Sequence, residues 1–113
     1  MTARLTSAML VSALVRRVGS EGGNAVIVAK GDATAGAILL DCLERGHRTA
    51  FRERVMGSDG RYSWSAVGPS IDSAVDEVSA WLDRRKNRDP DLWIVELDIP
   101  NAERFAAETM GDD

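Results

Sequence analysis

One apolar run near the end of the sequence constrains the fold more than any other segment. Residues 92–95 (LWIV) form a near-continuous apolar core inside the segment 91–98, which Pro90 and Pro100 bound. Such a run is typical of a strand in the interior of a sheet with both faces covered. Pro90 also keeps Asp89 away from helical backbone angles, so a helix before it has to end there. The run therefore predicts a buried strand that follows directly on a helix.

Four earlier segments also have the composition of strands. They are short, rich in β-branched or alternating apolar residues, and bounded by glycine-containing turns. These segments are residues 24–30, 37–44, 49–55 and 61–67. The Asp59-Gly60 pair before the last of them is a hairpin signal. Because the turns between these segments are short, they predict a four-stranded antiparallel meander.

Two segments have the apolar spacing of helices. In residues 7–18, Leu10, Leu14 and Val18 recur at intervals of four, and Thr6 or Ser7 can cap the start. A second stripe runs through residues 70–88, with Ser70 as its expected cap, acidic residues near its start and basic residues near its end. This charge distribution complements the helix dipole.

Together these elements predict an α+β fold in the order α-β-β-β-β-α-β, with a mostly antiparallel five-stranded sheet and two main helices. The 113 residues are the length of one domain, 1–113. Residues 101–113 are polar and acidic, and we expect them to form a loose C-terminal tail, with a single helical turn around Glu103–Glu108 as the alternative. Because only two helices flank five strands, we also expect one sheet face to be left uncovered.

Charge and cysteine content limit the possible partners and compartment. The net charge is −4 and the pI is about 5.0, which counts against nucleic acid as a partner because phosphate binding usually needs a basic face. Cys42 is the single cysteine, so no internal disulfide can form, which fits a reducing, cytoplasmic compartment. The apolar segment 7–15 is too short to span a bilayer, and no membrane association is expected.

Two groups of residues are candidates for binding a small anion. If the ends of the two helices are adjacent, Arg16, Arg17, Arg84 and Arg85 would form a basic corner able to grip phosphate or carboxylate. In the loop 31–36, glycines and backbone N–H groups could hold an anion beside Lys30 and Asp32. The competing interpretation is structural: the arginines complement helix dipoles and pair with nearby acids, and Asp32 caps a turn.

Other reactive residues do not form a recognisable site. Glu96 and Asp98 share one strand face, but the sequence indicates no third ligand for a metal ion. Cys42 has the character of a small buried hydrophobe, and His47 lies in a turn with no partner that spacing would select. We therefore predict no catalytic residue, metal or cofactor.

Three blocks resemble a family of small bacterial proteins, the domain of unknown function 1491. They are RLTSAMLVSALVRRV (residues 4–18), AVIVAKGDATAGAILLDCLE (25–44) and RRKNRDPDLWIVELD (84–98). Leu10 stands where many members of the family have tryptophan, and residues 99–105 depart from the family pattern. The resemblance implies an α+β fold and carries no activity, cofactor or catalytic residue.

Two functions are compatible with this sequence. The first is a non-catalytic protein that acts through protein contacts as a homo-oligomer, since an uncovered apolar surface usually marks an interface. The alternative is binding of a small anionic ligand at the basic corner of Arg16, Arg17, Arg84 and Arg85.

Overall fold

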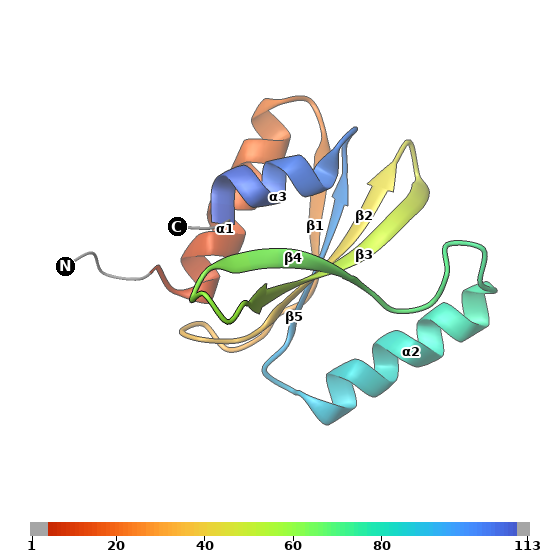
Figure 1. Ribbon diagram of the computed structural model, residues 1–113. Coiled ribbons are helices and arrows are strands. Elements are labelled where there is room, and N and C mark those ends of the chain that lie inside the picture. Colours follow the sequence, from red (N-terminus) through yellow and green to blue (C-terminus); the bar gives the residue numbers. More distant parts are fainter. Residues whose placement is uncertain (1–4, 111–113) are drawn as a thin grey trace.

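The computed structural model describes residues 5–110, in which one five-stranded sheet lies between helices on its two faces (Figure 1). In chain order the elements are α1 (Ser7–Ser20), β1 (Asn24–Ala29), β2 (Ile38–Glu44), β3 (His47–Met56), β4 (Tyr62–Val67), α2 (Val75–Arg88), β5 (Trp93–Asp98) and α3 (Ala102–Met110). The predicted α+β class and the order of the first seven elements are confirmed.

The order of strands in the sheet is β1-β5-β2-β3-β4. Strand β5 is antiparallel to β1 and parallel to β2, and the other neighbours are antiparallel. The predicted interior position of β5 is confirmed, since it lies between β1 and β2. The predicted meander is wrong at one place, because β5 separates β1 from β2. The near-continuous apolar strand takes the position where both of its faces are buried.

The core has two parts, one on each face of the sheet. Helices α1 and α3 cover one face, where the buried residues include Leu14, Leu40, Val95 and Phe105. Helix α2 lies on the other face, where they include Leu39, Phe51, Val78 and Ile94 (Figure 1). The expectation that one sheet face is left uncovered is therefore wrong, since the two predicted helices lie on opposite faces.

Helix α1 has the predicted cap and a later end. The Thr6 hydroxyl accepts a hydrogen bond from the Met9 backbone N–H at 3.2 Å, as the sequence predicts. The helix continues through Gly19 to Ser20, and the residue with a left-handed backbone is Gly22, at φ 90°. None of the helices within residues 5–110 combines the length and apolar composition needed to cross a bilayer.

Helix α2 begins one turn later than the sequence predicts. The Ser70 hydroxyl accepts from the Asp72 N–H within a turn, and the helix starts at Val75 with no side-chain cap. Ile71 and Val75 are consequently exposed, although they belong to the predicted apolar stripe. The predicted end is confirmed, because Arg88 is the last helical residue before Asp89 and Pro90.

The chain forms a third helix, Ala102–Met110, where the sequence predicts a loose tail with at most one helical turn around Glu103–Glu108. Ala102, Phe105 and Ala106 have helical spacing and are all buried against the α1 side of the core. That short apolar stripe explains the difference, because burying it stabilises α3 although the segment is otherwise polar. Residues 111–113 of the predicted tail lie outside the described part of the chain.

Candidate functional site

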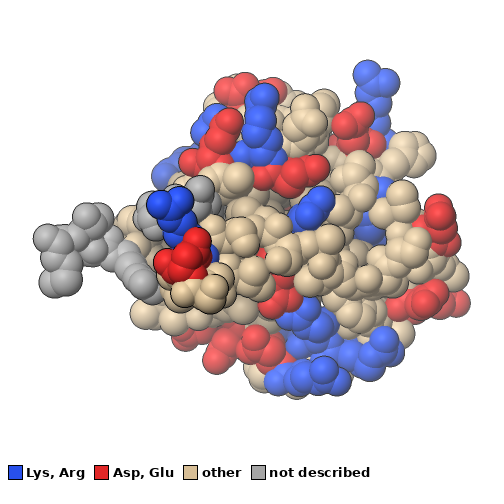
Figure 2. All heavy atoms as spheres, viewed as in Figure 1, with Lys and Arg blue, Asp and Glu red and all other residues tan. Residues whose placement is uncertain are grey.

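The structure does not bring the predicted basic corner together. Helices α1 and α2 lie on opposite faces of the sheet, so Arg16 and Arg17 are far from the arginines of α2 (Figure 1). Arg17 forms a 2.6 Å ion pair with Glu108 of α3. Figure 2 shows a basic group at the C-terminal end of α2, separate from the mixed charges near α1.

The α2 arginines also have structural surroundings. Arg85 forms a 2.7 Å ion pair with Glu53 of β3 and lies 5.8 Å from the centre of the Trp81 ring. Arg84 is exposed on the same helix. The competing structural interpretation therefore describes Arg17 and Arg85 better than a shared anion site.

The loop before β2 is a packed junction. The Asp32 carboxylate accepts from the N–H groups of Thr34 and Ala35, which is the turn cap that the sequence allows. The backbone N–H of Asp32 donates to the Asp91 carbonyl oxygen. A Cβ added at Gly31 or at Gly36 would collide with that same oxygen. The glycines are thus needed for close backbone approach to the start of β5.

Lys86 of α2 also bonds to this junction. Its Nζ donates to the carbonyl oxygens of Lys30, Pro90 and Leu92, at 3.1, 2.8 and 2.7 Å. The side chain of Lys30 itself is exposed. A single ammonium group therefore ties the end of α2 to the loop and to the start of β5.

The acidic residues of β5 lie on one face, as predicted, and Asp98 supports a turn. Its carboxylate accepts from the N–H groups of Arg45 and Gly46, both at 2.8 Å. These two residues have positive φ, the conformation of a two-residue hairpin turn. Residues 5–110 contain no group of three or more His, Cys, Asp or Glu side chains placed to hold a metal ion.

A buried ion pair lies on the α2 side of β2. Asp41 is 4% exposed and accepts two hydrogen bonds from the Arg48 guanidinium, at 2.7 and 2.8 Å. That guanidinium lies 4.6 Å from the centre of the Phe51 ring. Hydrogen bonding to Asp41 raises the pKa of Arg48. The only sequence signal for this pair is a carboxylate inside an otherwise apolar strand.

Cys42 is buried, as the sequence predicts, and it does not face His47. Burial, with a smaller effect of the Glu103 and Asp41 carboxylates, raises the pKa of its thiol from 9.0 to about 12. His47 is exposed at the far end of the hairpin, where it pairs with Glu44 in the register.

We expect the Cys42 thiol of the folded protein to react with an aromatic disulfide reagent at pH 8 about a thousandfold more slowly than in urea. The raised pKa of the thiol lowers the fraction present as thiolate by about that factor at pH 8, and its burial also limits access by the reagent. Because the pKa is higher in the folded state, the stability from the neutral thiol is complete below pH 9.0 and is lost as pH rises towards about 12. Equal rates with and without urea would show that Cys42 is accessible.

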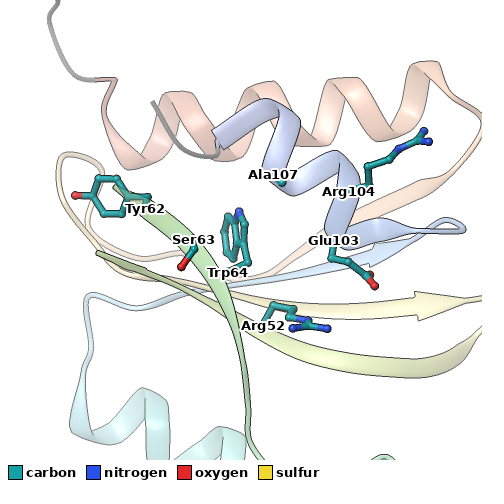
Figure 3. A pocket seen from close by; sticks show the side chains of 7 residues that line it. All are labelled: Arg52, Tyr62, Ser63, Trp64, Glu103, Arg104 and Ala107. Atoms are coloured by element: carbon teal, nitrogen blue, oxygen red, sulfur yellow. The ribbon is translucent and has the colours of Figure 1, made fainter. Parts of the chain in front are cut away.

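A cleft opens between α3 and the strands β3 and β4, with a volume of about 400 Å³ (Figure 3). Its lining residues are Arg52, Tyr62, Ser63, Trp64, Glu103, Arg104 and Ala107. Sequence reasoning missed this cleft because one wall is α3, which was expected to be loose. The sequence did indicate one wall of the cleft, because the alternation of β4 places Tyr62 and Trp64 on the same face of the strand.

Two N–H groups at this cleft are buried without hydrogen-bond partners among the described residues. They belong to Arg52 Nε and Trp64 Nε1. Arg104 is more exposed and lies 3.6 Å from Glu108. The cleft therefore offers hydrogen-bond donors and two aromatic side chains, Tyr62 and Trp64, with Glu103 as its acidic group.

The model of a protein family of unknown function, DUF1491, matches residues 5–107. The chain belongs to the DUF1491 family. The resemblance that the sequence blocks indicate is therefore confirmed. A search of curated proteins finds no match.

Solved structures of DUF1491 proteins share this fold. The crystal structure of a DUF1491 family protein from Caulobacter crescentus CB15 is 30% identical, with a TM-score of 0.78 over 90% of this chain and 94% of that one. An NMR structure of a DUF1491 protein from the same bacterium gives 0.75 at 30% identity, over 92% and 94%. The solution structure of Atu0922 from A. tumefaciens gives 0.67 at 32% identity, over 88% and 89%.

The three blocks that carry the DUF1491 resemblance meet at the loop before β2. Ser7 at the start of the first block donates its hydroxyl to the Gly36 carbonyl at 2.7 Å. Trp93 of the third block donates its indole N–H to the Asp32 carbonyl at 2.8 Å. Residues from all three blocks are thus joined by hydrogen bonds at the loop before β2.

Proposed function

We propose that this DUF1491 protein is a non-catalytic cytoplasmic protein that acts through protein contacts, as a homo-oligomer assembled along the free edge of β1. The observation that carries the proposal is the exposure of three consecutive apolar residues of that strand. Val26, Ile27 and Val28 are 53%, 46% and 55% exposed. Because successive side chains point to opposite faces, the strand is open on both of them.

Strand β1 is an edge whose backbone is available for pairing. It is bonded to β5 on one side, and within the described sheet its other side has no neighbour. Edge strands are usually protected by charged residues, proline or bulges. Asn24–Ala29 contains no charged residue, and its bulge, between Ile27 and Ala29, lies at the end of the strand.

A second copy of the same chain is the occupant that this edge favours. In an antiparallel pair of β1 strands related by a two-fold axis, the apolar segment of one strand lies beside the same apolar segment of the other. No charged side chain within Asn24–Ala29 would then face a like charge. The opposite edge, β4, is less suited, since its serines alternate with Tyr62 and Trp64 and the cleft wall of α3 lies beside it.

Three of the residues predicted to bind an anion are already paired within the chain, which supports a role in protein contacts over ligand binding at those residues. Arg17, Arg85 and Asp32 are engaged with groups of the same chain. The cytoplasmic location is supported by the single cysteine, Cys42, which is a buried thiol. These observations favour a folded scaffold that presents a surface.

Sedimentation of the Ile27→Lys variant tests the proposed assembly. The unmodified protein is expected to sediment as a dimer at micromolar concentration, and the variant as a monomer, because a lysine at the centre of the edge places like charges together. Val75→Lys is the matched control: Val75 is 79% exposed on α2, and the variant should remain dimeric. A monomeric unmodified protein, or a dimeric Ile27→Lys, would contradict the proposal.

A further inference from the structure

We propose that the cleft between α3 and β3–β4 binds a small organic monocarboxylate with a flat apolar body. Its size is within the range of small-molecule sites, at about 400 Å³. It lies on the face opposite α2, and it is distinct from the β1 edge at the far side of the sheet. The proposal is therefore independent of the proposed assembly.

The apolar part of the ligand would lie against Trp64. This side chain is partly buried and packs on the core beneath α1 and α3. Figure 3 shows its ring standing between β4 and α3, with Ala107 beside it on the helix. Alanine leaves the space open, so a flat group can contact the ring.

Arg52 supplies the charge that selects an anion. Among the described residues it forms no ion pair, whereas Arg17, Arg48 and Arg85 each have a carboxylate partner. Its Nε is buried and lacks an acceptor. A guanidinium with a free Nε–H presents two parallel donors, which match the two oxygens of a carboxylate.

Two neighbours narrow the class of ligand. The Glu103 side chain points towards Arg52 in Figure 3, yet the two form no ion pair. Its negative charge disfavours a dianion such as a phosphate monoester more strongly than a monoanion. The unpaired Trp64 Nε1–H adds a second donor, suited to an oxygen on the body of the ligand.

Titration with benzoate, followed by two-dimensional proton–nitrogen NMR of the indole groups, tests this site. The signal of Trp64 is assigned from its loss in Trp64→Phe, and benzoate at millimolar concentration should shift it saturably. Benzamide has the same ring without the charge, so it should bind at least about tenfold more weakly. Inorganic phosphate should also bind more weakly than benzoate.

Two substitutions of Arg52 decide whether the guanidinium is responsible. Arg52→Gln and Arg52→Lys should each weaken benzoate binding at least about tenfold, the second because lysine keeps the charge and loses the planar pair of donors. Arg16 is exposed on α1, away from the cleft lining, so Arg16→Gln removes an equal charge and should leave the affinity unchanged. A dispersed amide spectrum shows that a variant is folded. If one Arg52 variant does not fold, the affinity of the other decides whether the guanidinium binds benzoate.

Three results would overturn the assignment. The first is the absence of a saturable shift of the Trp64 indole signal with benzoate. The second is an affinity that is unchanged in a folded Arg52 variant. The third is binding of benzamide or phosphate at least as tight as that of benzoate, since the site would then not select a monocarboxylate.

Discussion

Replacing Trp93 with alanine is expected to lower the free energy of unfolding by about 3–5 kcal/mol. Trp93 begins the interior strand β5, is 2% exposed, and packs in the core under α1 and α3. Its indole N–H donates to the Asp32 carbonyl at 2.8 Å, so the substitution also leaves a carbonyl of the junction without this donor. Urea unfolding followed by far-ultraviolet circular dichroism measures the change.

Trp93→Phe separates the two contributions. Phenylalanine keeps most of the buried aromatic surface and loses the hydrogen bond, so it should cost less than half as much as alanine. An alanine variant with an unchanged midpoint would mean that Trp93 is not part of the core.

Replacing Gly31 with alanine is expected to cost about 3 kcal/mol, because the added methyl group has no space. A Cβ there would overlap the Asp91 carbonyl oxygen and lie 2.7 Å from both the Leu92 carbonyl carbon and Trp93 Cδ1. Two of these atoms are backbone, so relief requires moving the start of β5. The same urea experiment measures the loss.

Gly19→Ala is the matched control for this steric effect. Gly19 lies in the last turns of α1, and a Cβ there meets nothing within 4 Å. Alanine should therefore leave the stability unchanged or raise it by up to about 1 kcal/mol, through its higher helix propensity. Similar losses in both variants would show that the packing of Gly31 against β5 is not the cause.

Local pattern was sufficient for most elements of the fold. The apolar run of β5 predicted both a strand and its interior position, and Pro90 predicted the end of α2. The strand order was not predictable in the same way. The short turns favoured pairing of β1 with β2, whereas β5 lies between them. Burying both faces of β5 stabilises this order, but it depends on contacts between segments that are far apart in the sequence.

The candidate sites show the same division. Asp32 could be predicted as a turn cap because its partners are two and three residues away. The partner of Arg17 is Glu108, 91 residues along the chain, on a helix whose apolar stripe has three buried residues. The cleft depends on that same helix, so neither the ion pair nor the cleft could be found before α3 was known.

Self-association through β1 is tested most directly by amide hydrogen exchange at two protein concentrations, one below and one above the dissociation constant found by sedimentation. The outward-facing N–H groups of Asn24–Ala29 should exchange more slowly at the higher concentration, because a partner strand would bond them. Those of the other edge, Tyr62–Val67, should not change. Exchange of the β1 amides at the same rate at both concentrations would contradict the assembly proposed here.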